Sequence, residues 1–84
     1  MITVKVGNRI RKLRKQKNLS QEKLAHKSEL DRTYIASVEA GKRNISIVSL
    51  EKIVTKGLET DLSLFFSKIY EEWSNGKNWI IKKV

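Results

Sequence analysis

Apolar residues recur along most of this chain at intervals of three and four positions, the spacing that one face of an α-helix requires. In the first such segment, from about Val4 to Lys17, they fall at Val6, Ile10 and Leu13, and basic residues fill most of the positions between them. We therefore predict a first helix with one apolar face and one strongly basic face.

Capping signals as well as spacing predict three more helices. These cover Gln21 to Lys27, Arg32 to Ala40, and Ser46 to Gly57. Ser20 and Asp31 stand just before the first two, and such side chains accept hydrogen bonds from the free N–H groups of a first helical turn. The residues predicted to face inward are Leu24, Ala25, Leu30, Ile35, Val38, Ile47, Leu50, Ile53 and Val54.

A broad aromatic stripe marks a last predicted helix, which Asp61 would cap. The apolar residues that follow the helical spacing here are Leu62, Phe65, Phe66, Ile69, Tyr70 and Trp73. Because this stripe is wider than one side of so small a core needs, we predict that it also supplies a homodimer interface. The candidates for that interface are Leu62, Phe65, Phe66 and Ile69. The alternative is that about half of these residues are ordinary core.

Together these elements predict an all-α fold of five helices in a single domain. With 84 residues, of which 39% are apolar, the chain has too little apolar material for a second core. We place the domain at residues 1–76; the sequence assigns no structure to the tail at residues 77–84, and the alternatives are that it frays, packs on the last helix or extends the dimer contact.

The composition of the chain indicates in which compartment of the cell it works. The chain has no cysteine, which excludes a disulfide framework or a thiolate metal site and fits a reducing compartment. No apolar run is long enough to span a bilayer, and the chain does not open with the pattern of a secretory signal. We expect a cytoplasmic protein without a membrane partner.

Positive charge is concentrated in the first half of the chain. Residues 1–43 hold twelve Lys or Arg against four acidic residues, whereas residues 44–84 hold six against five, so the net charge of +9 divides into +8 and +1. Nucleic acid is the usual partner of a compact basic domain with such a field. The alternative is a solvated basic surface that only keeps the protein soluble.

The two short helices at residues 21–27 and 31–40, the second counted with its cap residue Asp31, have the spacing of a helix-turn-helix, with Ser28, Glu29 and Leu30 between them. Two helices that cross steeply through a turn of three or four residues need a small residue at their closest approach, and Ala25 meets that need. The outward residues of the second helix would then enter a DNA groove with their N-terminal end first.

These residues resemble a known family. The run Gln21, Glu22, Lys23, Leu24, Ala25, followed by Leu30, Ile35, Val38 and Glu39, is similar to the helix-turn-helix of the phage Cro and repressor class. The resemblance covers roughly residues 5 to 73 and implies the five-helix lambda-repressor-like domain.

A narrower resemblance is carried by Leu30 to Ile35 together with Glu39, Gly41, Arg43 and Asn44, which are similar to the controller proteins of bacterial restriction-modification systems. That resemblance implies a homodimer that binds operators ahead of its own gene and the endonuclease gene, first activating and later repressing transcription. A phage-type repressor, or an antitoxin-type regulator that acts with a protein partner, is the alternative.

One position departs from the class. Glu29 stands in the turn where glycine is preferred, because that residue often adopts a left-handed backbone conformation. We therefore expect Glu29 to carry a steric cost, and its replacement by glycine to stabilise the domain.

The residue types assign roles on DNA. Arg32 is the leading candidate for base reading, because its planar fork can bind guanine O6 and N7 together. Thr33 and Ser37 are further candidates for base edges, whereas Gln21, Tyr34, Arg43 and Asn44 are candidates for phosphate contacts. The alternative for each is an ordinary solvated polar side chain.

A two-fold dimer would set two recognition helices roughly 34 Å apart and would require a pseudo-palindromic operator. Activation would also require contact with RNA polymerase, for which Glu39 is a candidate. The alternative for Glu39 is a surface charge at the helix end or a partner of Arg43. We predict no enzymatic activity, cofactor or metal, because His26 is the single histidine and the sequence has no nucleophilic cysteine and no Gly-rich phosphate loop.

Overall fold

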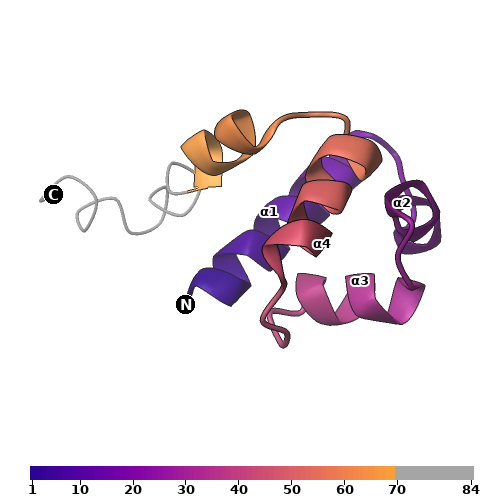
Figure 1. Cartoon of the computed structure of the whole chain (residues 1–84), viewed down its shortest axis with the longest axis horizontal. Helices are drawn as coiled ribbons and strands as arrows, with labels where there is room; N and C mark the ends of the chain where they lie inside the picture. Colours follow the sequence, from indigo (N-terminus) through magenta and orange to yellow (C-terminus); the bar gives the residue numbers. More distant parts are fainter. Residues whose placement is uncertain (70–84) are drawn as a thin grey trace, which may run out of the picture.

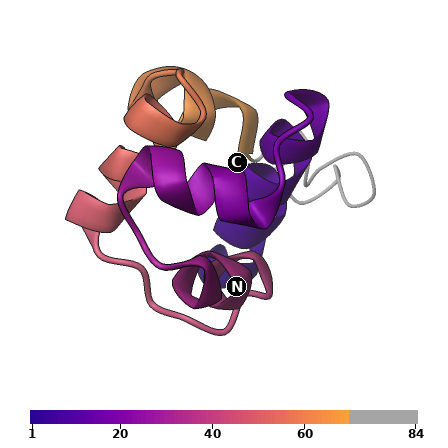
Figure 2. The same cartoon turned by 90° about the vertical axis from the view of Figure 1, so that its right-hand side faces the viewer.

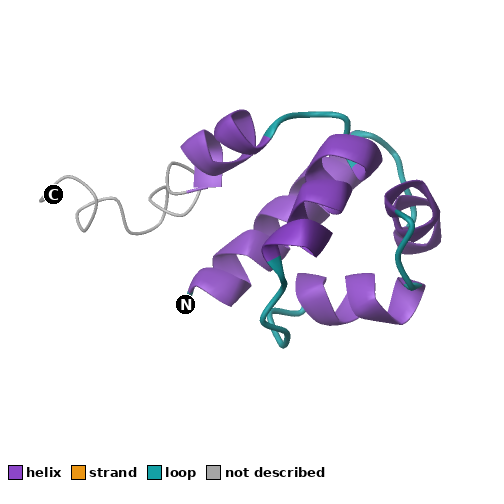
Figure 3. Ribbon diagram, viewed as in Figure 1, coloured by secondary structure: helices purple, strands orange, loops and turns teal. Residues whose placement is uncertain are grey.

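The computed structural model describes residues 1–69, and within that range it contains five helices and no strand (Figures 1 and 3). The predicted all-α class is confirmed. The helices are α1 at Ile2–Gln16, α2 at Gln21–Ser28, α3 at Arg32–Glu39, α4 at Ile47–Glu51 with its π-helical continuation η1 at Lys52–Gly57, and a last helix over residues 62–69. The predicted domain boundary at residue 76, the aromatic residues Tyr70 and Trp73, and the tail at 77–84 lie outside the described residues.

The second helix is the centre of the arrangement. It packs against α3 on one side and against η1 on the other, while α1 packs against α3. Figure 2 shows α2 lengthwise with α3 below it almost end-on, so the two helices cross steeply. The α3 helix and the loop that follows it form the lower edge of the molecule in Figure 1. None of the helices within residues 1–69 is both long and apolar enough to cross a membrane.

One core joins all five helices. Its buried residues are Val6, Ile10, Leu24, Ala25, Ile35, Val38, Leu50, Ile53, Val54, Leu58, Phe65 and Ile69, with Leu13 and Leu30 packed at its edge. The inward faces predicted for the first three helices are therefore confirmed. The prediction for Ile47 is wrong, because its side chain is 81% exposed. It lies in the first turn of α4, before that helix reaches the core at Leu50.

Side-chain oxygens cap three of the helices, at Ser20 and Asp61 as predicted and also at Ser46, which was predicted to be the first residue of its helix. The Oγ atoms of Ser20 and Ser46 accept hydrogen bonds from the backbone N–H groups of Lys23 and Ser49, and Asp61 Oδ1 accepts one from that of Leu64, over 2.7–3.1 Å. Asp31 occupies the N-cap position of α3, but its carboxylate makes no such cap. It accepts the hydroxyl of Thr33 at 2.6 Å, and the backbone N–H groups of Thr33 and Arg32 also help to lower its pKa, so Asp31 marks the start of α3 as predicted but without the standard cap hydrogen bond.

The end of α1 is tied to the end of α3 by a buried ion pair. Arg14 donates from Nε to Glu39 Oε2 at 2.6 Å and from Nη2 to Glu39 Oε1 at 2.9 Å. It also donates from Nη1 to the carbonyl of Leu19 at 2.8 Å, and Gln21 Nε2 donates to Glu39 Oε1 at 3.1 Å. The reading of Glu39 as a surface charge or a partner of Arg43 is therefore wrong. Its side chain is only 3% exposed because it is fully engaged with Arg14 and Gln21.

A glycine allows α1 to lie directly on α3. A Cβ atom on Gly7 would sit 2.3 Å from the carbonyl oxygen of Val38 and 2.9 Å from that of Glu39, far inside contact distance. The periodicity of α1 gave no sign of this role, because a glycine inside a helix only lowers its propensity. Gly7 fixes how closely α3 approaches the rest of the domain.

Candidate nucleic-acid interface

The turn between α2 and α3 has the predicted left-handed residue. Glu29 adopts φ 60° and ψ 39°, and the backbone N–H of Leu30 then donates to the carbonyl of Ala25 at 2.9 Å. Ala25 is 3% exposed at the crossing of the helices, as predicted for the small residue there. The carboxylate of Glu29 points to Lys56, which donates to it at 3.0 Å and lowers the pKa of Glu29 through that hydrogen bond and its charge.

This turn leaves the N-terminal end of α3 open to solvent. Arg32 and Thr33 are exposed, and Tyr34 and Ser37 are half-buried. Within residues 1–69 the guanidinium of Arg32 has no hydrogen bond or ion pair, so all of its donors remain for a ligand. An arginine at the start of α3 that has no partner among the described residues has the chemistry that guanine recognition needs.

The two hydroxyl candidates are engaged within the protein. Thr33 donates to Asp31 Oδ2, which is the main cause that lowers the pKa of Asp31. Ser37 donates from Oγ to the carbonyl of Thr33 at 3.0 Å. Each hydroxyl keeps acceptor lone pairs, and Thr33 keeps its methyl group. In this conformation they can accept a hydrogen bond or contact a thymine methyl, but their donor hydrogens are used.

The candidates for phosphate contacts come from α2, from α3 and from the loop after it. Gln21 opens α2, and its amide has a second N–H beyond the one given to Glu39. Arg43 and Asn44 are exposed in the loop between α3 and α4. The guanidinium carbon of Arg43 lies 4.8 Å from the centre of the Tyr34 ring, so two of the candidates contact each other. Sequence spacing gave no sign of that contact.

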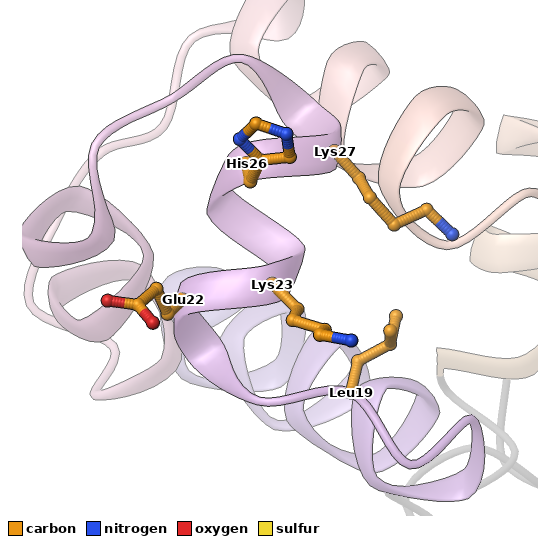
Figure 4. A pocket seen from close by; sticks show the side chains of 5 residues that line it. All are labelled: Leu19, Glu22, Lys23, His26 and Lys27. Atoms are coloured by element: carbon orange, nitrogen blue, oxygen red, sulfur yellow. The ribbon is translucent and has the colours of Figure 1, made fainter.

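A separate hollow of about 570 Å³ lies on the outer surface of α2 (Figure 4), lined by Leu19, Glu22, Lys23, His26 and Lys27. His26 is exposed there. The lining contains no side chain of α3, so the hollow is distinct from the face that carries Arg32. Among residues 1–69 no group of three or more His, Cys, Asp or Glu is placed to hold a metal ion.

The structure places two of the four predicted dimer residues in the core and leaves the other two with exposed surface. Phe65 and Ile69 are 0% and 2% exposed and belong to the core of the single chain, whereas Phe66 is 40% exposed and Leu62 is half-buried. Phe65 and Phe66 meet edge to face, with their ring centres 5.3 Å apart. The interface stays a prediction, and Phe66 and Leu62 are the members of the set with surface left to offer.

Other exposed apolar side chains were missed by the sequence reasoning, namely Ile2, Val4, Ile47, Val48 and Leu64, with exposed fractions from 37% to 81%. A groove of about 230 Å³ separates the start of α1 from Phe66, and Ile2, Val6, Ile45 and Leu50 help to line it. Ile47 and Val48 directly follow the cap residue Ser46, so both lie in the first turn of α4, before that helix reaches the core at Leu50.

Known proteins share this pattern of helices. Residues 10–56 match the helix-turn-helix family. The control protein C.MunI of a Mycoplasma species is 53% identical over 72 residues, which cover 84% of this chain and 96% of that protein. The control protein C.BamHI of Bacillus amyloliquefaciens is 50% identical over 48 residues, which cover 56% of this chain and 59% of that protein.

A solved structure agrees with the fold over nearly its whole length. The crystal structure of the restriction-modification controller protein C.Esp1396I superposes with a TM-score of 0.82 at 44% identity, covering 89% of this chain and 96% of that chain. The same controller protein has also been solved as a tetramer in complex with its natural 35 base-pair operator, with a TM-score of 0.80 at 46% identity over 86% of this chain and 93% of that one.

Proposed function

We propose, from the premise that this chain belongs to the helix-turn-helix family and within it to the control proteins of restriction-modification systems, that it is a sequence-specific transcriptional regulator that binds operator DNA. The observation that carries the proposal is the exposed N-terminal end of α3, where Arg32 has no partner within residues 1–69. The relative C.Esp1396I binds an operator as a tetramer, and similarity over nearly its full length supports the same class of ligand here.

On this proposal α3 enters the major groove, and different residues of the domain contact the bases and the phosphates. Arg32 reads a guanine, and Thr33 and Ser37 contact base edges or a thymine methyl. Gln21, Tyr34, Arg43 and Asn44 hold the phosphate backbone on either side and so fix the register of α3 in the groove. The net charge of +8 over residues 1–43, which include all of α1 to α3, supplies the attraction to the polyanion.

The regulator acts as a homodimer on a pseudo-palindromic operator, with its two α3 helices roughly one DNA turn, about 34 Å, apart. The exposed apolar side chains at Ile47, Val48, Leu64 and Phe66 support a second copy as the partner of that surface. A tetramer on DNA, as in the relative, is compatible with two such dimers placed side by side.

The regulated genes are its own and that of the associated endonuclease, and its place is the cytoplasm. The similarity to C.MunI and C.Esp1396I covers almost the whole of those proteins, which favours this role over a phage-type repressor or an antitoxin-type regulator. Its role is binding rather than catalysis. Activation includes a contact with RNA polymerase, which Glu39 cannot supply because its carboxylate is buried against Arg14.

The test is selection of bound sequences from a random duplex pool, followed by a salt titration of the best site. We expect a two-fold related motif, and a slope of log K against log salt of about 0.9 for each phosphate neutralised. Enrichment of no motif, with binding that depends on salt alone, would overturn the operator proposal. Pull-down of protein partners would then be the next experiment, because the antitoxin-type alternative requires one.

A further inference from the structure

The loop that carries Arg43 leaves α3 in a fixed direction. The N–H of Gly41 donates to the carbonyl of Val38 at 3.0 Å, and that of Lys42 donates to the carbonyl of Ser37 at 3.1 Å. These bonds form a Schellman motif, in which the residue after the C-cap takes the left-handed conformation. Gly41 has φ 74°, and a Cβ there would meet Val4 of α1 at 2.9 Å, so the turn is also pressed against α1.

The far end of the loop is fixed as well. Ile45 is half-buried against the core, and Ser46 caps α4 through the N–H of Ser49. Only Lys42, Arg43 and Asn44 lie between these two fixed points, and all three have exposed side chains. The backbone of Arg43 is therefore restrained although its side chain is on the surface.

The side chain of Arg43 returns to α3. Its guanidinium carbon lies 4.8 Å from the centre of the Tyr34 ring, within the range of a cation–π contact. Tyr34 belongs to the first turn of α3, and its ring is packed at the edge of the core, so the ring is itself held in place. The contact holds the guanidinium of Arg43 against a residue that lies two positions after Arg32 on α3.

We propose that Tyr34 is a positioning residue, whose ring holds the guanidinium of Arg43 at the DNA-reading end of α3 before DNA arrives. A cation–π contact engages the charge of the guanidinium but none of its N–H donors in a conventional hydrogen bond. Arg43 is thus oriented and still able to donate to a phosphate. A flexible arginine must lose this side-chain freedom on binding, and prior ordering removes part of that cost.

This inference rests on the proposed function and makes the effects of Tyr34 and Arg43 non-additive. Two independent phosphate contacts would instead contribute separately, so a double-mutant cycle distinguishes the two cases. The variants are Tyr34→Phe, which keeps the ring, Tyr34→Leu, which keeps an apolar contact with the core but no ring, and both of these combined with Arg43→Ala. A thermal melt of each variant checks that it is folded.

The experiment has a readout without DNA and one with it. In the free protein, proton NMR should show the side-chain protons of Arg43 shifted upfield by the ring in the wild type and in Tyr34→Phe, but not in Tyr34→Leu. With the selected operator, Tyr34→Leu should bind about two- to fivefold more weakly than Tyr34→Phe. With Arg43→Ala in the background, that difference should vanish.

Two results would overturn the proposal. One is an equal difference in DNA affinity between Tyr34→Leu and Tyr34→Phe with and without Arg43, because the ring of Tyr34 would then act on DNA directly. The other is the absence of the upfield shift in the wild type. If the wild type selects no operator, the proposed function is wrong, but the positioning role can still be tested. The affinities of the same variants are then measured on a random duplex, and the difference between Tyr34→Leu and Tyr34→Phe must again depend on Arg43.

Discussion

The buried pair of Arg14 and Glu39 gives the sharpest prediction for stability. Glu39 accepts two hydrogen bonds from Arg14, at 2.6 and 2.9 Å, and one from Gln21 at 3.1 Å. The two charged side chains are only 10% and 3% exposed. The substitution Glu39→Gln keeps the size of the side chain but removes the charge, and so leaves the guanidinium buried without its counter-ion.

The expected loss is a large part of the total stability. Removing one partner of a buried ion pair costs about 3–5 kcal/mol, because the remaining charge is desolvated and unpaired. A chain of this length has a free energy of unfolding of about 4–13 kcal/mol at the usual stability per residue. Replacing both residues, as in Arg14→Met with Glu39→Met, should restore much of the loss, because no unpaired charge is left in the core.

The assay is urea unfolding at neutral pH followed by the far-UV circular dichroism of the helices. All variants are measured at one protein concentration, since dimerisation couples stability to concentration. Glu59→Gln is the matched control, because it removes the charge from an exposed pair with Lys27 and should barely move the midpoint. A loss for Glu39→Gln no larger than that of the control, or a double variant as unstable as the single one, would refute the reasoning.

Three further predictions concern binding, assembly and the turn. In a site-selection comparison, Arg32→Ala should relax the sequence preference at one base pair, at a cost of about 1–3 kcal/mol of binding free energy, whereas Arg43→Ala should weaken binding to all sequences alike. If both variants lost affinity uniformly for all sequences, Arg32 would not be a base-reading residue. Phe66→Ser should shift the sedimentation of micromolar protein toward monomer without unfolding it, because this ring is 40% exposed, and an unchanged dimer would place the interface elsewhere. Glu29→Gly should have a melting temperature a few degrees above that of Glu29→Ala. Both variants lose the ion pair with Lys56, but the alanine keeps a Cβ atom at a residue in the left-handed conformation. Equal melting temperatures would contradict the strain at this residue.

Local patterns in the sequence were enough to predict the helices and the caps at Ser20 and Asp61. Each of these depends on residues within a few positions of one another, as Ser20 and Lys23 do across the first turn of α2. The left-handed conformation of Glu29 was implied instead by the resemblance to the phage Cro and repressor class, in which glycine is preferred at this position of the turn.

Most of the errors concern partners that are distant in sequence; the exception is Asp31, whose carboxylate accepts the hydroxyl of Thr33 two positions away instead of a backbone N–H. Arg14 and Glu39 are 25 positions apart, and a periodicity argument assigns each charged residue to the surface. Ile47 fits the apolar spacing of its helix but lies before the point at which that helix meets the core. The cation–π contact of Arg43 with Tyr34 depends on how the loop after α3 turns back, which the spacing of residues does not determine.

The contact of Gly7 with α3 has an evolutionary consequence. Gly7 lies two helical turns before Arg14 on α1, and its missing side chain allows α1 to touch the carbonyl oxygens of Val38 and Glu39 directly. Any larger residue at position 7 would lift the end of α3 and lengthen the bonds between Arg14 and Glu39. A larger residue at position 7 therefore requires that α1 and α3 move apart, so this position and the packing of the two helices can change only together.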